Sequence, residues 1–406
     1  MTGPFIAIVA DDLTGSGDTA VQFVRAGWAT QLSVGGAAQA LREPAVGATE
    51  VLAVTTHSRP LPAAEAAAVV RREVELLRAA GVQRLYKKVD STLRGAFRAE
   101  IEAAREAWGD DAVAVVCPAF PATGRVLRGG VLYVHGVRVT ETSAATDPVT
   151  PVTQSHVPTL LGCALVRPDV GETPEALAAR IDAAGPVVVV DAETMEDMDR
   201  LARAVARLGE RAVPVGAGGL AEPLARVWAA GQAQGPVLVV VTSQHNAARR
   251  QAAALQQVGA HAWAPALDDL ADPQAWRAWS DRICAQAVQE AGGADMLLLL
   301  APDGRRPGLD SETVAQRLGE LAARLMRHLP VGGVVATGGD GASQVLAALG
   351  ASGIALVDEV TGGVPLGTLT GGPAAGLPIV TKAGGFGDDD VLIRAARAIR
   401  ERRFHS

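Results

Sequence analysis

The sequence has 406 residues, 49% of them hydrophobic, which is enough to bury the cores of two domains of ordinary size. Its formal net charge of −7 and pI near 5.6 argue against a nucleic-acid partner, and no apolar run approaches the ~20 residues that a membrane-spanning helix needs. Three widely spaced cysteines and a start without a basic, apolar leader argue against a disulfide framework and export, so we expect a cytoplasmic protein.

Short β-branched runs alternate with Ala-, Arg- and Glu-rich segments along the chain. In order, the predicted strands read FIAIVA, EVLAVTT, RLYKKV, AVAVVCPA, PVVVVDA, PVLVVVTS, DMLLLLAP, GGVVATGG and IALVDEV. Apolar runs bounded by turn residues and separated by helices are typical of parallel strands buried on both faces. The break in this rhythm at residues 129–158 predicts a hairpin around the sequence HG and then a Thr/Pro-rich loop.

This alternation predicts an α/β protein of two domains, each a largely parallel sheet flanked by helices. The seam is expected at AAGQAQGPV, Ala229 to Val237, where a helix ends in small and polar residues before a new strand. We therefore expect an N-terminal domain over residues 1–232 and a C-terminal domain over residues 233–406.

The segment IVADDLTGSGDTA places Asp11 and Asp12 directly after the first predicted strand and before a helix predicted over DTAVQFVRAG. Ligands of open α/β sheets bind outside the carboxyl ends of strands, so this acidic pair lies where chemistry is expected. Asp18 or Ser16 is expected to cap the helix. Because capping does not need the Asp11–Asp12 pair and clustered carboxylates repel one another, we interpret the pair as functional.

The segment YKKVDSTLRG is a second strand end with polar side chains. Regular alternation puts Lys88 and Asp90 on one face of the strand and Lys87 on the other. A cation, a carboxylate and the hydroxyls of Ser91 and Thr92 at one sheet edge suit a polyhydroxylated anion. A surface ion pair with a Ser/Thr cap is the structural alternative.

Two arginines follow other strand ends. Arg59, in THSRP, is suited to bidentate recognition of a carboxylate. Arg125, in CPAFPATGR, has two interpretations that stay open, anion binding and simple exposure to solvent. Cys117 in the same segment is interpreted as a small apolar strand-end residue, since no base for a nucleophilic role is identifiable.

The second half has glycine-rich turns after strands. The segment VVATGGDGASQVLAALG reads strand, turn and helix, so its backbone N–H groups can face a phosphate, and Asp340 can orient a metal or a water. Glycine is expected at 339 because of close backbone approach or a positive φ. A second such loop lies in TGGPAAGLPIVTKAGGFGDDDVL, and Ser243 begins a third junction. Two glycine loops in one domain indicate a nucleotide site, against the alternative of tight turns and helix caps.

Two common nucleotide motifs are missing from these segments. No loop matches GxxxxGK[ST], which argues against a P-loop kinase. The first strand is followed only by a fragment of GxGxxG, so a nicotinamide dehydrogenase is a weak interpretation.

Seven segments in this order resemble the four-carbon acid sugar kinase family, which includes threonate, erythronate and 3-oxo-tetronate kinases. They read ADDLTGSGDTA, KKVDSTLRG, CPAFPATGR, GGVLYVHGVRV, DPVTPVTQSHV, ATGGDGA and KAGGFG, and extend over nearly the whole chain. The resemblance implies an N-terminal domain that binds the sugar acid and a C-terminal domain that binds ATP. It also implies phosphorylation of the terminal hydroxyl of a C4 acid, with Mg²⁺ as the metal.

The resemblance also implies site residues. The candidate substrate-binding residues are Asp11, Asp12, Arg59, Lys88, Val89, Asp90 and Ser91. The candidate ATP-binding residues are Ser243, Gly338, Gly339, Asp340, Gly341, Gly384, Gly385 and Gly387. The chain departs from the family in two places, with VTSQHN at a GSCS-like junction and TGGDGA in place of TGGDTA, so a threonine hydroxyl is missing at Gly341.

A hydroxyl that attacks the γ-phosphate benefits from a carboxylate that accepts its proton. Asp12 is the first candidate for this base, with Asp90 and Asp340 as competitors, and the metal ligands stay unassigned. Two other functions stay open: a non-enzymatic sugar-acid sensor, which needs only one ligand site, and an NAD-dependent oxidoreductase acting on similar acids. Homo-oligomerisation, the particular acid and its stereochemistry are also left open by the sequence.

Overall fold

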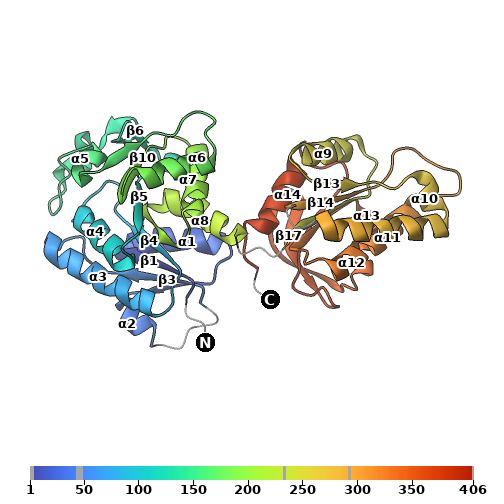
Figure 1. Cartoon of the computed structure of the whole chain (residues 1–406), viewed down its shortest axis with the longest axis horizontal. Helices are drawn as coiled ribbons and strands as arrows, with labels where there is room; N and C mark the ends of the chain where they lie inside the picture. The colour runs from blue at the N-terminus through green and yellow to red at the C-terminus, as the bar shows by residue number, and fades with distance from the viewer. Residues whose placement is uncertain (1–3, 43–48, 232–234, 291–293, 405–406) are drawn as a thin grey trace. The chain divides into compact units, whose positions relative to one another are not determined.

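The structure is a computed structural model that describes residues 4–42, 49–231, 235–290 and 294–404 (Figure 1). It divides into two units, Met1–Trp228 and Ala229–Ser406. Each unit is built on a mostly parallel sheet flanked by helices, so the expected two-domain α/β fold is confirmed. The boundary predicted between residues 232 and 233 lies outside the described residues.

The first unit contains an eight-stranded sheet in which the paired strands are parallel. In spatial order its strands are β2 (Thr30–Ser33), β3 (Val51–Thr55), β1 (Ile6–Ala10), β4 (Arg84–Lys88), β11 (Ala212–Gly216), β5 (Val113–Cys117), β10 (Val187–Val190) and β9 (Ala164–Val166). Every residue of β1, β3 and β5 is buried, as expected for apolar runs covered on both faces.

Helices flank this sheet (Figure 1), and a small antiparallel sheet follows β5. The helices are α1 (Leu13–Arg25), α2 (Gly36–Ala40), α3 (Ala63–Ala79), α4 (Phe97–Trp108), α5 (Val157–Leu161), α6 (Pro174–Ala183), α7 (Met195–Arg207) and α8 (Gly218–Ala230). The small sheet consists of β6 (Arg125–Arg128), β7 (Val131–Val134) and β8 (Val137–Arg138). The predicted hairpin at HG is confirmed, since His135 and Gly136 both have positive φ between β7 and β8.

The second unit contains a seven-stranded sheet. Its spatial order is β13 (His261–Trp263), β14 (Met296–Leu300), β12 (Val237–Val241), β15 (Gly333–Thr337), β18 (Pro378–Lys382), β17 (Val364–Thr370) and β16 (Gly353–Thr361). The segment IALVDEV was expected to be a buried parallel strand, and this expectation is wrong. It lies in β16, which pairs antiparallel with β17 alone at the sheet edge, so Leu356 and Val357 are exposed.

The helices of the second unit pack on the two faces of its sheet. They are α9 (Asn246–Gln257), α10 (Leu267–Ala271), α11 (Pro273–Glu290), α12 (Ser311–His328), α13 (Gly339–Ala348) and α14 (Val391–Arg400). Alternate residues of β12 belong to different cores: Leu238 and Val240 pack with α11, α12 and α13, whereas Val239 packs with α9 and α14. Within the described residues, no helix is long and apolar enough to cross a membrane.

The strand registers bring particular loops to one edge of each sheet. In the first unit Ala10 lies opposite both Thr55 and Lys88, so the segments after β1, β3 and β4 start side by side. In the second unit Thr337 lies opposite both Val241 and Lys382, so the loops after β12, β15 and β18 do the same. These two carboxyl edges contain the residues that the sequence singles out.

Candidate active site

The carboxyl edge of the first sheet has a pocket of about 490 Å³. Of the candidate substrate residues, Asp12, Arg59, Lys88, Asp90 and Ser91 line it. Asp11 and Val89 do not line it: both are buried, and the Val89 carbonyl accepts a hydrogen bond from Lys88 Nζ at 2.8 Å.

The acidic turn begins helix α1. Asp12 is the N-cap of α1, and its Oδ1 accepts a hydrogen bond from the Gly15 N–H at 2.9 Å. The expectation that Asp18 or Ser16 caps this helix is wrong, because the helix starts five residues earlier than the apolar pattern suggests, and both residues lie inside it. Asp12 therefore combines a capping role with a place in the pocket.

Gly15 lies inside α1, where glycine is normally unfavourable. A Cβ atom at this position would lie 2.5 Å from Asp12 Oδ1 and 2.6 Å from Lys88 Nζ. Glycine thus allows the carboxylate and the ammonium group to approach the first turn of the helix. Gly15 was not among the site residues predicted from the sequence, although a glycine shortly after an acidic pair was a usable signal.

Arg59 connects the carboxylates of this edge. Its Nε donates to Asp11 Oδ2 at 2.6 Å, and its Nη2 donates to Asp12 Oδ1 at 2.8 Å and lies 3.5 Å from Asp90 Oδ1. Burial alone would lower the pKa of Arg59, but the hydrogen bond with Asp11 and the three nearby carboxylates raise it. Asp11, although buried, therefore acts on the pocket by fixing the Arg59 guanidinium.

Lys87 and Lys88 lie on opposite faces of β4, as strand alternation predicts. Lys87 is fully buried and its Nζ lies 2.7 Å from Oε2 of Glu100 on α4, whereas Lys88 faces the pocket. Burial lowers the pKa of the Lys88 ammonium group, and the charges of Asp11, Asp90 and Asp12 partly oppose this effect. The pocket thus contains a desolvated cation surrounded by carboxylates.

Asp90 is held by Arg94 through two hydrogen bonds, Nη2 to Oδ1 at 2.8 Å and Nε to Oδ2 at 3.0 Å. Burial would raise the pKa of the Asp90 carboxyl, but hydrogen bonds from Arg94 and Thr92 and the charges of Arg59 and Arg94 hold it far below its usual range. Arg94 also donates from Nη1 to Asp147 Oδ2 at 3.0 Å, which links the pocket to the Thr/Pro-rich loop. A carboxylate held ionised in this way is a poor proton acceptor.

Arg94 and Arg125 line the pocket together with Arg59 and Lys88. Arg94 was not among the residues predicted from the sequence, and no local pattern signals its pairing with Asp90, because residues 89–96 are not helical. Arg125, for which anion binding and exposure to solvent both stayed open, also lies in the wall of this pocket. These four cations line the pocket beside the carboxylates of Asp12, Asp18 and Asp90, and such cations can bind the carboxylate of a ligand.

The carboxyl edge of the second sheet has a pocket of about 610 Å³. The candidate residues Ser243, Gly338, Gly339, Asp340 and Gly341 line it. Gly384, Gly385 and Gly387 do not, but their loop contacts it, since a Cβ at Gly384 would overlap the Ser243 hydroxyl.

The turn after β15 has several glycines, and the physical reason for glycine differs from one position to the next. Gly338 has a φ of +86°, which disfavours other residues, whereas a Cβ at Gly339 would meet nothing within 4 Å. The positive φ expected at 339 therefore belongs to 338. A Cβ at Gly341 would overlap the Oγ1 of Thr242, which donates to the Thr337 carbonyl at 2.7 Å. The hydroxyl that is missing at position 341 is thus replaced in space by that of Thr242.

Comparison with known proteins gives the identity of the two units. Residues 6–224 match a sugar-binding N-terminal domain and residues 238–392 a nucleotide-binding C-terminal domain. D-Threonate kinase of Bordetella bronchiseptica is 75% identical over 404 residues, which cover 100% of both chains. The chain belongs to the four-carbon acid sugar kinase family.

Further members of the family align over nearly the full chain. D-Threonate kinase of Salmonella typhimurium is 32% identical and covers 97% of this chain and 98% of its own. D-Erythronate kinase of Heliobacterium modesticaldum is 33% identical, with 95% and 94% covered. A crystal structure of a Bordetella bronchiseptica protein, described as a domain-swapped dimer with bound citrate, is 75% identical, has a TM-score of 0.95 and covers 99% of this chain and 100% of its own.

Membership confirms the expected class of enzyme, a kinase that transfers a phosphoryl group to an alcohol group of a sugar acid. It decides against the sugar-acid sensor and the nicotinamide oxidoreductase. The 490 Å³ pocket lies in the sugar-binding domain, and the glycine loops lie in the nucleotide-binding domain of the family.

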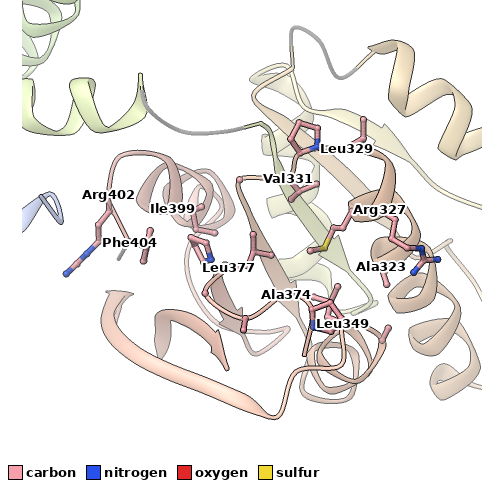
Figure 2. Close-up of a pocket in the computed structure, with 18 of the residues that line it drawn as sticks. Ala323, Arg327, Leu329, Val331, Leu349, Ala374, Leu377, Ile399, Arg402 and Phe404 are labelled. Carbon is pink, nitrogen blue, oxygen red and sulfur yellow. The ribbon is translucent and has the colours of Figure 1, made fainter. Parts of the chain in front are cut away.

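A third pocket, of about 750 Å³, lies in the second unit (Figure 2). Its lining includes Val331 and Gly332, which precede β15, and Pro378, the first residue of β18, so it lies at the amino edge of the sheet. Leu349 and Leu377 contribute apolar side chains to its wall, and Arg327 and Arg402 contribute guanidinium groups. None of the candidate residues lines this pocket, and kinase chemistry is expected at the opposite edge.

Proposed function

We propose that this enzyme phosphorylates the terminal hydroxyl of D-threonate with ATP as the donor. The observation that carries the proposal is the 75% identity to a D-threonate kinase over the whole of both chains. The 490 Å³ pocket supports it, because its cations suit a carboxylate and its Asp and Ser side chains suit the hydroxyls of a small sugar acid.

In this proposal the acid binds in the N-terminal pocket. Lys88, which is nearly buried, supplies the charge that attracts the carboxylate, and Arg94 and Arg125 line the same space. Arg59, held by Asp11 and Asp12, and Ser91 supply hydrogen-bond donors.

We assign the proton acceptor to Asp12. The terminal hydroxyl oxygen forms a bond to the γ-phosphorus, the bond from that phosphorus to the β–γ bridging oxygen breaks, and ADP leaves. The hydroxyl proton passes to the Asp12 carboxylate. Asp90 is the weaker candidate because its environment holds its pKa far below the usual range, and a useful base needs a pKa closer to the working pH.

The nucleotide binds, in this proposal, at the 610 Å³ pocket and the adjoining glycine loop. Gly338, Gly339 and Gly341 bring backbone N–H groups at the start of α13 toward the phosphates, and Ser243 adds a hydroxyl. Gly384, Gly385 and Gly387 act from the neighbouring loop, which contacts Ser243.

Mg²⁺ is expected to enter with ATP. Within the described residues, no group of three or more His, Cys, Asp or Glu side chains is placed to hold a metal ion. This fits Mg²⁺, which takes substrate phosphates, waters and only one or two carboxylates, and Asp340 is an exposed carboxylate on the pocket wall. Bound Mg²⁺ neutralises charge on the transferred phosphoryl group.

An ADP-release assay tests the substrate. D-Threonate, D-erythronate and the corresponding 3-oxo acids are compared at saturating ATP and Mg²⁺, with GTP as a second donor. We expect the highest kcat/KM with D-threonate and ATP. A higher value for another acid would replace the substrate, and ADP release no faster than without any acid would reject the proposed reaction.

We also propose that the enzyme is a homodimer and works in the cytoplasm. The dimer is suggested by the domain-swapped dimer of the 75% identical relative, and the compartment by the need for ATP. Light scattering during size-exclusion chromatography checks the first proposal, with a monomer at all concentrations as the contrary result. Cell fractionation checks the second.

A further inference from the structure

Lysine is rare in this chain and is used in only two places. Of its 37 Lys and Arg residues, three are lysines: Lys87, Lys88 and Lys382. All three are buried, and each lies at the carboxyl end of a strand, β4 or β18. Lys88 lines the acid pocket and Lys87 forms an ion pair with Glu100. Neither explanation applies to Lys382, which lies in the second unit.

The Lys382 ammonium group lies beneath the glycine loop 383–388. Its Nζ donates to the carbonyls of Ala383 at 2.7 Å, Phe386 at 2.8 Å and Gly384 at 3.3 Å. Only 3% of the residue is exposed. A compact ammonium group with three donors fits these three carbonyls, whereas a planar guanidinium does not.

Gln251 on α9 holds the other end of the same loop. Its Nε2 donates to the carbonyls of Phe386, Gly387 and Asp388 at 3.0, 3.0 and 2.9 Å, and the side chain is completely buried. Lys382 and Gln251 together therefore bind five of the six carbonyls of residues 383–388 from inside the loop.

The carbonyls that face Lys382 determine the direction of the N–H groups in the same loop. In a trans peptide unit the C=O of one residue and the N–H of the next point in opposite directions, and the described residues contain no cis peptide. The N–H groups of Gly384, Gly385 and Gly387 therefore point away from Lys382. In the part of the chain that the structure describes, these three N–H groups donate to no protein acceptor.

The charge of Lys382 is not balanced locally. Among the described residues, the ammonium group bonds to backbone carbonyls and to no carboxylate, and burial lowers its pKa without an opposing anion. A buried unpaired charge is costly, so its retention needs a compensating role. An anionic ligand above the outward N–H groups would supply the missing negative charge.

We propose that Lys382 is a positioning residue for the polyphosphate of the nucleotide, acting through the N–H groups of Gly384, Gly385 and Gly387. Its ammonium group and the Gln251 amide turn the loop carbonyls inward, and its positive charge adds to the potential at the phosphates. This inference rests on the proposed assignment of ATP to the second unit.

Calorimetric titration of the full-length enzyme with ADP tests the inference. Lys382→Met removes the charge and the donors at similar length, and we expect the Kd for ADP to rise roughly tenfold or more. Gln251→Met removes the two amide N–H donors that three carbonyls share, without changing the charge, and a smaller rise is expected. Arg400→Met is the matched control, since it removes a cation from the far end of α14 in the same unit, and its Kd should stay within about twofold.

A second readout separates positioning from general stability. The Kd for D-threonate and the melting temperature are measured for each variant, and the KM for ATP is compared with kcat. We expect a higher KM for ATP and an unchanged Kd for D-threonate. An unchanged Kd for ADP in folded Lys382→Met or in Gln251→Met would overturn the inference, as would equal losses for ADP and D-threonate. If the wild-type enzyme binds no ADP, the nucleotide assignment itself fails.

Discussion

Asp12 and Asp90 differ in how far their carboxylates are exposed to a ligand in the pocket. Asp12 accepts hydrogen bonds from Gly15 and Arg59 while its side chain stays 27% exposed to the pocket, whereas Asp90 is 8% exposed and held by Arg94. A reacting hydroxyl can therefore reach Asp12 more easily.

Asp12→Asn is expected to lower kcat by ~10²–10⁴-fold while the Kd for D-threonate changes much less. The amide keeps the shape of the side chain but cannot accept the proton. Single-turnover phosphoryl transfer at saturating ATP and acid measures the effect, with Asp90→Asn and Asp340→Asn in parallel and folding checked by circular dichroism. Near-normal turnover in Asp12→Asn would remove it as the base, and a raised KM with normal kcat would make it a binding residue.

Asp90 gives a prediction about stability and pH. Its pKa in the folded protein lies far below the ordinary value of 3.8, so folding favours the ionised form. The stabilisation is fully present above about pH 5 and is lost as the pH falls below 3.8 toward the folded-state pKa. Asp90→Asn should therefore reduce the free energy of unfolding by about 3 kcal/mol at pH 7, and by less at pH 3.

Urea denaturation at both pH values measures this difference. Asp389→Asn is the control, because Asp389 forms an exposed ion pair with Arg250 that is worth little. An Asp90→Asn deficit that is equal at pH 7 and pH 3 would show that the ion pair is not its source.

At the scale of elements, the residue that follows β12 and the first turn of α13 compete for the same space. Thr242 occupies the space that any side chain at position 341 would need. Gly341→Ala alone should therefore displace the turn, costing about 1–3 kcal/mol of stability and weakening ADP binding. In the background of Thr242→Gly the same substitution should be far less harmful.

A double-mutant cycle of Thr242→Gly and Gly341→Ala measures the coupling, with melting temperature and ADP affinity as readouts. We expect a coupling energy of at least about 1 kcal/mol. Additive losses would mean that the two residues do not compete for space.

At the scale of the whole molecule, the two proposed ligand sites lie in separate units, and single substitutions should affect them separately. Lys88→Met removes one of the four cations of the acid pocket and should weaken D-threonate binding while ADP binding persists. Gly339→Val should do the reverse, because its Cβ enters open space in the protein itself and would obstruct only the nucleotide. Calorimetry with each ligand measures both, and a loss of both affinities in either folded variant would contradict the separation.

The sequence by itself determined the fold class, the kinase family and most of the candidate residues. Apolar runs that are buried on both faces predict parallel strands, and short motifs at their ends, such as the acidic turn at Asp12 and the turn at Gly338, are local in sequence. It could not determine the start of α1, because Thr14 to Gly17 have weak helix propensity and Asp12 alone supplies the cap.

Only the tertiary structure decided which residues from distant segments meet. The overlap of position 341 with Thr242, the approach of Gly15 to Lys88 and the hold of Gln251 on the loop after Lys382 join residues that are 73 to 137 positions apart. The exposure of β16 likewise depends on its place at the sheet edge and not on its apolar composition. The physical reason is that contact between such residues depends on strand order and register, which local patterns of hydrophobicity do not specify.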